Sequence, residues 1–499
     1  MIKENRERLK EKTGLKRELG LLHAVMLGVG GAIEAGVFVM LGYATGLAGS
    51  AIIIALIICG IINFFTMLSY AELGSTLPKA GGEYTFSKAA YGGFVSFLTG
   101  WFEWISNMFY AALSAVGFGL IISYLVPVNV PIVALITIVV FTFVNIRGVE
   151  EVGKSQVLMV GTLLAILIGF ILNGLVFPKV ETFQLIAPSG PLGVIQATAF
   201  IFVVYLGAEA IAVAQAEIKE PGKTIPRAIL LTSIILLIIY PLVAFAMLRI
   251  VSPEALVGQS SPLIYAAELS AGFAGKVALV VAGTIAALSS INTSIMAQSR
   301  VAYALSRDGY FPRVFQRIHR RFSTPHVAVV VGAVFTAVLA ATGVINFVGY
   351  ATDFGFIIGF ALVNLSLMKL RKEKPLLHRP FKVPFYPFTP IAGIVTSLFL
   401  LVFIDPAVLS LGIILCVLAV LAYYIRMVGY IRFRVAFGGI SLGLGGFTSV
   451  LTYLIASGNL QLNGISSSSV NIIVVVLLFT SLIEVAAGIM NVTAKNDRY

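Results

Sequence analysis

One acidic residue lies at the centre of the first long apolar segment of the sequence, with glycines on both sides. Residues 28–38 read GVGGAIEAGVF, and the acid is Glu34. If this segment crosses a membrane, a carboxylate there costs about 2.5–3.5 kcal/mol, so Glu34 should face a cavity and have a task. It could bind a cationic group of a substrate, or carry a proton during a transport cycle. A protonated or hydrogen-bonded glutamate that only fills a gap is the third interpretation.

Glycines also interrupt the apolar segment that lies five segments further along the chain. The first segment is broken at Gly28, Gly30, Gly31 and Gly36, and the later one at Gly207. Transporters built from inverted five-helix repeats have unwound helices at these two places, where free backbone groups near the middle of the bilayer bind substrate. Glycines that only allow close helix packing are the alternative. The paired spacing favours a transporter.

No other residues of the sequence have the spacing of a catalytic or metal site. The histidines lie near predicted helix ends without ligand spacing, and the cysteines lie inside apolar segments. These residues are His23, His319, His326, His378, Cys59 and Cys416. The motif G-x-x-x-x-G-K-[ST] of ATP-driven pumps is absent, and so is a repeated filter segment of the kind that channels use. We therefore expect neither an enzyme nor a resident cofactor or metal.

The elements that position Glu34 and the glycines are predicted to be membrane-spanning helices. Hydrophobic residues make up 59% of the chain and charged residues 11%, and the mean hydropathy is +1.00. Apolar runs such as residues 157–176 and 229–248 have the roughly 20 residues that a helix needs to cross a bilayer. The predicted spans are residues 21–47, 50–77, 93–126, 129–147, 153–177, 193–218, 226–251, 274–306, 326–342, 346–370, 387–403, 405–425, 436–457 and 469–491. Shorter segments of alternating polarity would indicate a barrel instead. The sequence thus predicts an all-α polytopic membrane protein.

The distribution of basic residues predicts the orientation of the helices. The formal net charge is +12. With about 14 spans and a cytoplasmic N-terminus, every Lys and Arg except Lys179, Arg249 and Lys276 lies on the cytoplasmic side. This bias follows the positive-inside rule, so nucleic-acid binding is not needed to explain the charge. Both termini are expected to be cytoplasmic tails, at residues 1–20 and 492–499.

Further motifs follow the first segment along the chain. They are residues 69–84 (SYAELGSTLPKAGGEY), 202–209 (FVVYLGAE), 217–227 (EIKEPGKTIPR), 304–312 (ALSRDGYFP) and 379–384 (RPFKVP). Their order and spacing resemble those of the amino acid, polyamine and organocation transporter superfamily. The resemblance implies a core of two inverted five-helix repeats, residues 21–177 and 193–370. Residues 387–491 would add helices 11–14, as in the 14-span branch of cationic amino acid transporters.

In this family, backbone amides of the unwound first helix bind the substrate carboxylate, and carbonyls of the broken sixth helix bind its amino group. The resemblance therefore implies a substrate site made of Gly30, Gly31, Ala32, Ile33, Glu34, Ala35, Gly36, Val203, Val204, Tyr205, Gly207 and Ala208. Glu34 departs from the family, which usually has glycine there, and loosely resembles an acid of plant-type polyamine transporters. Ala208 replaces an aromatic residue and leaves room for a longer side chain. Glu209 could line the cavity or cap the broken helix.

The coupling ion is left open between H⁺ and Na⁺. Some prokaryotic relatives carry a lysine in the fifth helix whose ammonium replaces sodium, but that position falls near Thr162 or Leu163 here. A sodium site could form from carbonyls of the first helix and hydroxyls of the eighth, because hard cations bind oxygen. The hydroxyl candidates are Ser289, Ser290 and Thr293. Such hydroxyls more often bond to their own helix backbone, and Glu34 is the candidate for a proton.

Charged residues at predicted cytoplasmic helix ends could form a gate. We expect a network that opens and closes as the transporter alternates, made of Glu217, Arg300, Arg307 and Asp308. Solvated helix ends are the alternative interpretation. Three further acids at membrane depth are left without a role: Glu103, Asp353 and Glu484.

Together these observations predict a secondary transporter in the plasma membrane that moves amino acids by alternating access, coupled to H⁺ or Na⁺. Its expected partners are a small-molecule substrate and the lipid bilayer, and no nucleic acid. A transporter of polyamines or other organic cations, with Glu34 as the cation-binding carboxylate, is the alternative. The oligomeric state is left open.

Overall fold

The structure is a computed structural model of the chain. It describes residue 17 and residues 19–78, 81–147, 152–180, 184–322 and 324–427, followed by 437, 440–446, 448–449, 452, 455–456 and 467–493. The chain divides into two units, Met1–Cys416 and Val417–Tyr499, which are considered separately. Most of each predicted tail and most of the span predicted at residues 436–457 lie outside the described residues.

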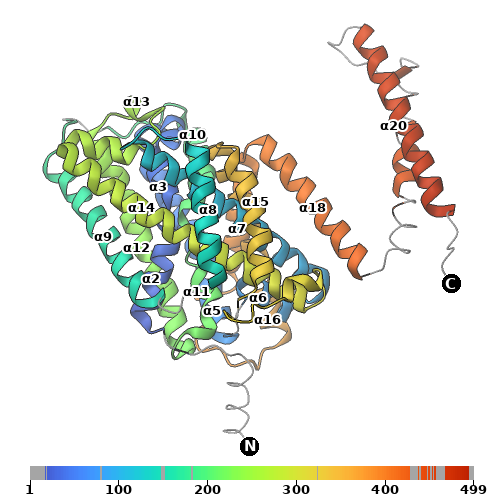
Figure 1. Cartoon of the computed structure of the whole chain (residues 1–499), viewed down its shortest axis with the longest axis horizontal. Coiled ribbons are helices and arrows are strands. Elements are labelled where there is room, and N and C mark those ends of the chain that lie inside the picture. Colours follow the sequence, from blue (N-terminus) through green and yellow to red (C-terminus); the bar gives the residue numbers. More distant parts are fainter. Residues whose placement is uncertain are drawn as a thin grey trace, which may run out of the picture. The chain divides into compact units, whose positions relative to one another are not determined.

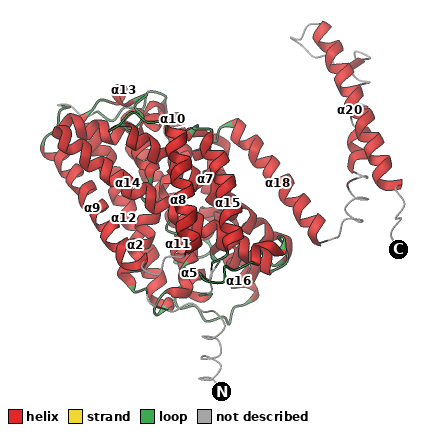
Figure 2. Cartoon of the chain, viewed as in Figure 1, coloured by secondary structure: helices red, strands yellow, loops and turns green. Residues whose placement is uncertain are grey.

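The first unit is built from helices that lie side by side (Figures 1 and 2). Its longer helices are α5 (Ile52–Thr76), α7 (Gly93–Ser123), α8 (Val130–Arg147), α9 (Val152–Val176), α12 (Pro221–Ile250), α14 (Pro262–Arg307), α15 (His326–Ala341), α16 (Ile345–Glu373) and α17 (Phe388–Leu400). Within the described residues, β-type pairing is limited to one isolated bridge between Leu19 and Ile218. The predicted all-α class is confirmed for this part of the chain.

Nine helices among the described residues are long and apolar enough to cross a membrane. Four shorter apolar helices accompany them, at Leu21–Ala32, His326–Ala341, Phe388–Phe403 and Val476–Ala487. A helix satisfies its backbone hydrogen bonds within a single segment, which is what a bilayer requires of a spanning element. These helices agree with a polytopic membrane protein, while the total of about 14 spans stays a prediction.

The first apolar segment is divided into three short helices. They are α2 (Leu21–Ala32), α3 (Ala35–Val39) and α4 (Leu41–Ala48). Between α2 and α3 the backbone is extended, with φ −77° and ψ 99° at Ile33 and φ −118° and ψ −178° at Glu34. The break therefore falls within the glycine-rich stretch where the sequence predicts it, and it leaves Glu34 outside regular helix.

The sixth apolar segment is also broken, at the glycine where the sequence predicts it. Helix α10 (Gly190–Ile201) continues as a 3₁₀ turn at Phe202–Tyr205, after which Leu206 is extended. Gly207 then has φ 124°, a conformation that only glycine adopts without strain. The short helix α11 (Ala210–Val213) follows. The span predicted at residues 193–218 therefore corresponds to the apolar segment Gly190–Val213, with the predicted break at Gly207.

Helix α14 contains one non-helical residue, Gly272, with φ 60° and ψ −147°. Two helices are thus joined at this glycine, one beginning at Pro262 and one ending at Arg307. The second agrees with the span predicted at residues 274–306. Helix α14 packs against α7, which also packs against α16, while α5 packs against α12. The amphipathic helix α6 (Gly82–Ala90) lies against both α7 and α16.

A buried ion pair joins two of the sequence motifs. Glu72 of α5 is fully buried, and it accepts hydrogen bonds from Arg371 of α16 and from the backbone N–H of Val383, the latter at 2.7 Å. Arg379 forms a second ion pair with the same carboxylate at 3.2 Å. Residues 69–84 and 379–384 are therefore in contact, with one carboxylate shared by two arginines.

The C-terminal unit begins within α18 (Pro406–Met427) and contains α20 (Ser467–Thr493). These helices agree with the spans predicted at residues 405–425 and 469–491. Within α20, the carboxylate of Glu484 accepts a hydrogen bond from Thr448 at 3.0 Å. This contact gives Glu484 a local partner inside the C-terminal unit.

Candidate functional site

The carbonyl groups at the end of α2 bond to side chains from other helices. The hydroxyl of Tyr240 on α12 donates to Ala32 O at 2.9 Å, and Tyr110 on α7 donates to Gly31 O at 3.0 Å. Ser289 on α14 donates to Gly30 O at 3.3 Å. Three different helices therefore hold the first break in place through hydrogen bonds to its backbone.

The break between α10 and α11 is held in a similar way. Asn63 on α5 donates its amide to Tyr205 O at 2.8 Å, and Tyr110 donates to Leu206 O at 3.1 Å. The N–H of Gly207 donates to Oε1 of Glu209 at 2.8 Å, so this glutamate caps the broken helix. Tyr110 thus contacts both breaks with a single hydroxyl.

The two breaks touch through their backbones. A β-carbon at Gly207 would overlap the carbonyl carbon of Gly31 and the amide nitrogen of Ala32. A β-carbon at Gly31 would lie 2.9 Å from Gly207 O. Side chains are therefore excluded from both positions, and the glycines are required by a close approach of two chain segments as well as by local unwinding.

Glu34 lies at the first break and is fully buried. Its Oε2 accepts a hydrogen bond from Ser114 of α7 at 2.7 Å, and the Ser114 hydroxyl is 2.9 Å from that of Ser290 on α14. Its Oε1 has no hydrogen-bond partner and lies where a β-carbon of Gly36 would come within 2.5 Å. The glycine leaves space for this carboxylate.

A cavity of about 40 Å³ lies beside the two breaks. It is lined by Gly31, Glu83, Glu103, Asn107, Tyr110, Gly207, Glu209, Ala210, Val213, Thr293, Ser294, Met296, Ala297 and Phe356. Three of these side chains are carboxylates, from α6, α7 and the residues before α11, and none is basic. The cavity is therefore small, and all the charged side chains that line it are acids.

Only part of the predicted substrate site lines this cavity, namely Gly31 and Gly207. Gly30, Ala32, Ile33, Ala35, Gly36, Val203, Val204, Tyr205 and Ala208 are buried around the breaks, and the buried Glu34 bonds to Ser114 instead of lining the cavity. The carbonyl of Val203 is bonded to the Leu206 N–H within the 3₁₀ turn, at 3.0 Å. The carbonyls that meet side chains from other helices belong to Tyr205 and Leu206 instead.

The three hydroxyls predicted to bind an ion make different contacts. Ser289 and Ser290 face the first break through the contacts with Gly30 and Ser114. Thr293 lines the cavity, but its hydroxyl donates to the Ser289 carbonyl of its own helix. Among the described residues, no three His, Cys, Asp or Glu side chains are placed to hold a metal ion.

The predicted gate residues form two ion pairs. Arg300 lies 3.6 Å from Glu217, and Arg307 lies 3.8 Å from Asp308. Asp308 also pairs with Lys88 at 2.5 Å and accepts a hydrogen bond from the Tyr84 hydroxyl. Burial alone would raise the pKa of Asp308, but hydrogen bonds from Lys88 and Tyr84 and the charges of Lys88 and Arg307 hold it below its usual value.

The sequence did not predict several residues of the site. Asn63, Tyr110, Ser114 and Tyr240 are single polar residues inside long apolar helices, and their contacts come from helices distant in sequence. Polar residues at membrane depth are expensive unless they are hydrogen-bonded, and this is the signal that could have pointed to them. Tyr84 and Glu83 belong to the sequence GGEY at the end of the motif at residues 69–84, and the sequence predicted no role for either side chain.

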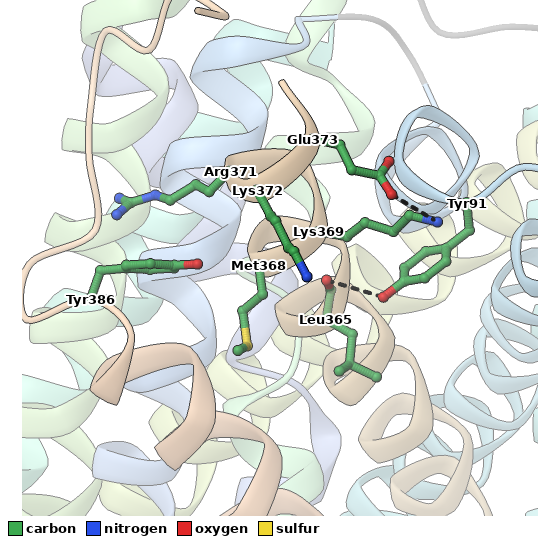
Figure 3. A pocket seen from close by; sticks show the side chains of 8 residues that line it. All are labelled: Tyr91, Leu365, Met368, Lys369, Arg371, Lys372, Glu373 and Tyr386. Atoms are coloured by element: carbon green, nitrogen blue, oxygen red, sulfur yellow. Dashed lines mark hydrogen bonds and ion pairs between the residues drawn. The ribbon is translucent and has the colours of Figure 1, made fainter. Parts of the chain in front are cut away.

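A larger groove of about 740 Å³ lies elsewhere, at the end of α16 (Figure 3). It is lined by Tyr91, Leu365, Met368, Lys369, Arg371, Lys372, Glu373 and Tyr386. Lys369 pairs with Glu373 at 3.7 Å, and the Tyr91 hydroxyl donates to Leu365 O, as Figure 3 shows. None of the predicted site residues is in this groove, so the site is assigned to the smaller cavity beside the breaks.

Comparison with known proteins points to one family over most of the chain. The family described as "Amino acid permease" matches residues 19–425. The cystine/glutamate transporter of Homo sapiens is 30% identical over 446 residues, covering 84% of this chain and 87% of the relative. The branched-chain amino acid permease BcaP of Bacillus subtilis is 27% identical over 409 residues, covering 78% and 88%. The methylthioribose transporter of Bacillus subtilis is 30% identical over 409 residues, covering 76% and 87%.

Proposed function

Because the chain belongs to the amino acid permease family, we propose that it is a secondary transporter that moves amino acids across a membrane. It is a multi-pass membrane protein of a family of transporters, and it is not an enzyme. Alternating access, in which a helix bundle rocks around a site near the bilayer midplane, is the mechanism we assign to it.

The observation that carries this proposal is the contact between the two helix breaks. Gly31 and Gly207 meet backbone to backbone, and both line the cavity. The extended backbone at Ile33 and Glu34 leaves the first N–H groups of α3 without carbonyl partners from a preceding helical turn. Free N–H and C=O groups close together can bind the carboxylate and ammonium groups of one amino acid.

We assign residues 21–177 and 193–370 to two inverted repeats and residues 387–491 to additional spans. The position of the breaks in the first helix of each proposed repeat supports this assignment. The bias of basic residues supports a plasma-membrane protein with both termini in the cytoplasm. On this topology, the pairs Glu217–Arg300 and Arg307–Asp308 lie at the cytoplasmic end and are the proposed gate.

Coupling to H⁺ or Na⁺ is part of the proposal. Glu34 is the candidate proton carrier near the first break, since its Oε1 is buried without a partner. Ser289 and Ser290 are the candidate hydroxyls for Na⁺, because both face that break. The alternative, a polyamine transporter with Glu34 binding the cation, has less support, because two of the relatives described above are named for amino acids.

A ligand screen followed by transport assays tests the proposal. The purified chain is heated with each of the common amino acids, and with putrescine and spermidine, in the presence and absence of Na⁺. A ligand present at 100 times its Kd stabilises the folded state by about 2.7 kcal/mol, which is measurable as a rise in Tm. The expected result is stabilisation by a subset of amino acids, followed by uptake of the same compounds into proteoliposomes.

Gly207→Ala is the matched variant, since a side chain there would separate the two breaks. It should lose both the ligand-induced rise in Tm and uptake, while Gly161→Ala on the open face of α9 should retain them. Stabilisation by polyamines alone would favour the alternative. Absence of both binding and uptake for every amino acid would sink the proposal.

A further inference from the structure

Five buried carboxylates lie in the core of the first unit without basic partners. Glu34 and Asp353 are 0% exposed, Glu83 is 2% exposed and Glu103 is 4% exposed, while Glu209 has its Oε2 buried. Among the described residues, no ion pair joins any of the five to Lys, Arg or His. Both oxygens of Asp353 and one oxygen each of Glu34, Glu83 and Glu209 have no hydrogen-bond partner.

Three of these carboxylates form one group around the cavity. Glu83 comes from α6, Glu103 from α7 and Glu209 from the break before α11. Glu103 accepts the Tyr84 N–H at 3.0 Å, and Glu83 accepts the Tyr70 hydroxyl at 2.5 Å. The remaining Glu83 oxygen is directed against Gly359 of α16, where a β-carbon would overlap it. The groups that face Glu83 are Tyr70 from α5, Glu103 from α7, Glu209 from the break before α11 and Gly359 from α16. None of them is a cation.

Glu34 and Asp353 are the other two acids, and both are 0% exposed. Glu34 accepts a hydrogen bond from Ser114, which in turn contacts Ser290. These neighbours are neutral. Burying several unpaired negative charges is prohibitive, so both groups need positive charge in the form of bound protons or another cation.

Hydroxyl groups lie between the two sets of acids. Ser114 donates to Glu34, and its hydroxyl is 2.9 Å from that of Ser290. Tyr110 lines the cavity, and its hydroxyl donates to Gly31 O and Leu206 O at the two breaks. A series of acids and hydroxyls at membrane depth is the arrangement used in proton relays.

We infer that Asp353, Glu34, Glu209, Glu103 and Glu83 form a proton-binding path linked by Ser114, Ser290 and Tyr110, and that H⁺ is the coupling ion. This inference rests on the proposed transport function and adds the ion and its site. A carboxylic acid that binds a proton becomes neutral, which removes the repulsion among the acids around the cavity. No covalent bond is made or broken other than the transferred O–H bonds.

Helix α6 contacts both the cavity and the end of α14. Glu83 at its start faces the cavity, whereas Tyr84 and Lys88 bind Asp308 at the end of α14. Burial raises the pKa of Glu83 to about 8, the Tyr70 hydrogen bond opposes this rise, and the Glu209 charge adds to it. Release of the proton would place a charge beside Glu103 and Glu209 and would favour withdrawal of α6 from the cavity.

Proteoliposomes with a trapped pH-sensitive dye test the inference. The voltage is clamped with potassium and valinomycin, Na⁺ is omitted, and a mixture of leucine, serine, glutamate and lysine is added outside. We expect a change in lumen pH during net uptake, and no such change in protein-free vesicles. Exchange of labelled for unlabelled amino acids at equal pH is measured in parallel, since it reports transport without net proton movement.

Variants then locate the proton path. Glu83→Gln and Asp353→Asn should each lose the lumen pH change and the accumulation driven by a pH gradient. Glu254→Gln, at an exposed acid on the short helix α13 (Pro253–Leu256), should retain both. Gel filtration and Tm establish that each variant is folded, and Glu103→Gln replaces any variant that is not.

The outcomes separate this inference from the proposed function. Exchange without a change of lumen pH, or accumulation that requires Na⁺, would overturn the proton path while leaving amino acid transport intact. Full pH-driven accumulation in both Glu83→Gln and Asp353→Asn would also overturn it. Absence of exchange in the wild type for every one of the common amino acids would overturn the proposed function, and the inference with it.

Discussion

Gly207 lies directly against the backbone of Gly31, so the broken first and sixth helices meet without any intervening side chain. The same two glycines line the cavity. Tyr110 donates to a carbonyl on each side of this contact, at Gly31 and at Leu206.

Gly207→Ala should destabilise the protein strongly. The variant combines a β-carbon that overlaps Gly31 with a φ of 124° that disfavours side chains, and we expect a loss of about 2–4 kcal/mol. Thermal unfolding in detergent measures the effect. Gly161→Ala is the control, because a β-carbon there meets nothing within 4 Å and alanine favours helix. Equal Tm values for the two variants would contradict the close contact.

Glu34→Gln should abolish driven uptake in proteoliposomes while the protein still folds. The amide keeps the shape of the side chain and can still accept the Ser114 hydrogen bond, but it neither binds a proton nor carries charge. Uptake by this variant at the wild-type rate would show that Glu34 has only a structural role. Glu254→Gln makes the same chemical change at an exposed position and should transport normally.

Tyr110→Phe should weaken the region where the two breaks meet. It removes a hydroxyl that bonds to Gly31 O and Leu206 O, and leaving these carbonyls buried without a donor costs about 1–3 kcal/mol. A lower Tm and slower uptake are the expected readouts. Tyr43→Phe, at a ring that is 45% exposed, should change neither by a comparable amount.

Glu72→Gln should destabilise the protein by about 3–5 kcal/mol, because it removes the charge that Arg371 and Arg379 share in a buried site. The control is Glu373→Gln, which removes the exposed i,i+4 pair with Lys369 and should cost only about 0.3–0.5 kcal/mol. Denaturation of both variants in detergent provides the comparison. Similar losses would show that the buried pair contributes no more than a surface pair.

Stability should fall as the pH rises from about 4.5 to about 8, owing to Glu83. Its pKa in the folded state is raised to about 8, chiefly by burial, from an ordinary value of 4.5. Between these values the unfolded chain loses the proton while the folded chain keeps it, so deprotonation favours unfolding. Below the lower value the contribution is fully present. The Tm of Glu83→Gln should vary less with pH over this range, and parallel Tm profiles would contradict the assignment.

The sequence by itself determined that the chain forms membrane helices and where two of them break. Long apolar runs require helices in a bilayer, and glycines at residues 30, 31, 36 and 207 are local features that permit unwinding. The family motifs also predicted a transporter, and the sequence predicted a charged network of Glu217, Arg300, Arg307 and Asp308, within which the structure pairs Glu217 with Arg300 and Arg307 with Asp308.

The tertiary structure decided which polar groups meet inside the bundle. Glu72 and Arg371 are 299 positions apart in the sequence, and Ser114 and Glu34 are 80 positions apart. No local sequence pattern therefore predicts either contact. Glu83 and Glu103 are uninformative as single acids in the sequence, yet packing of α6 against α7 brings them to one cavity. The helical period defines the faces of each helix, but the packing of helices distant along the chain selects which faces share a buried space.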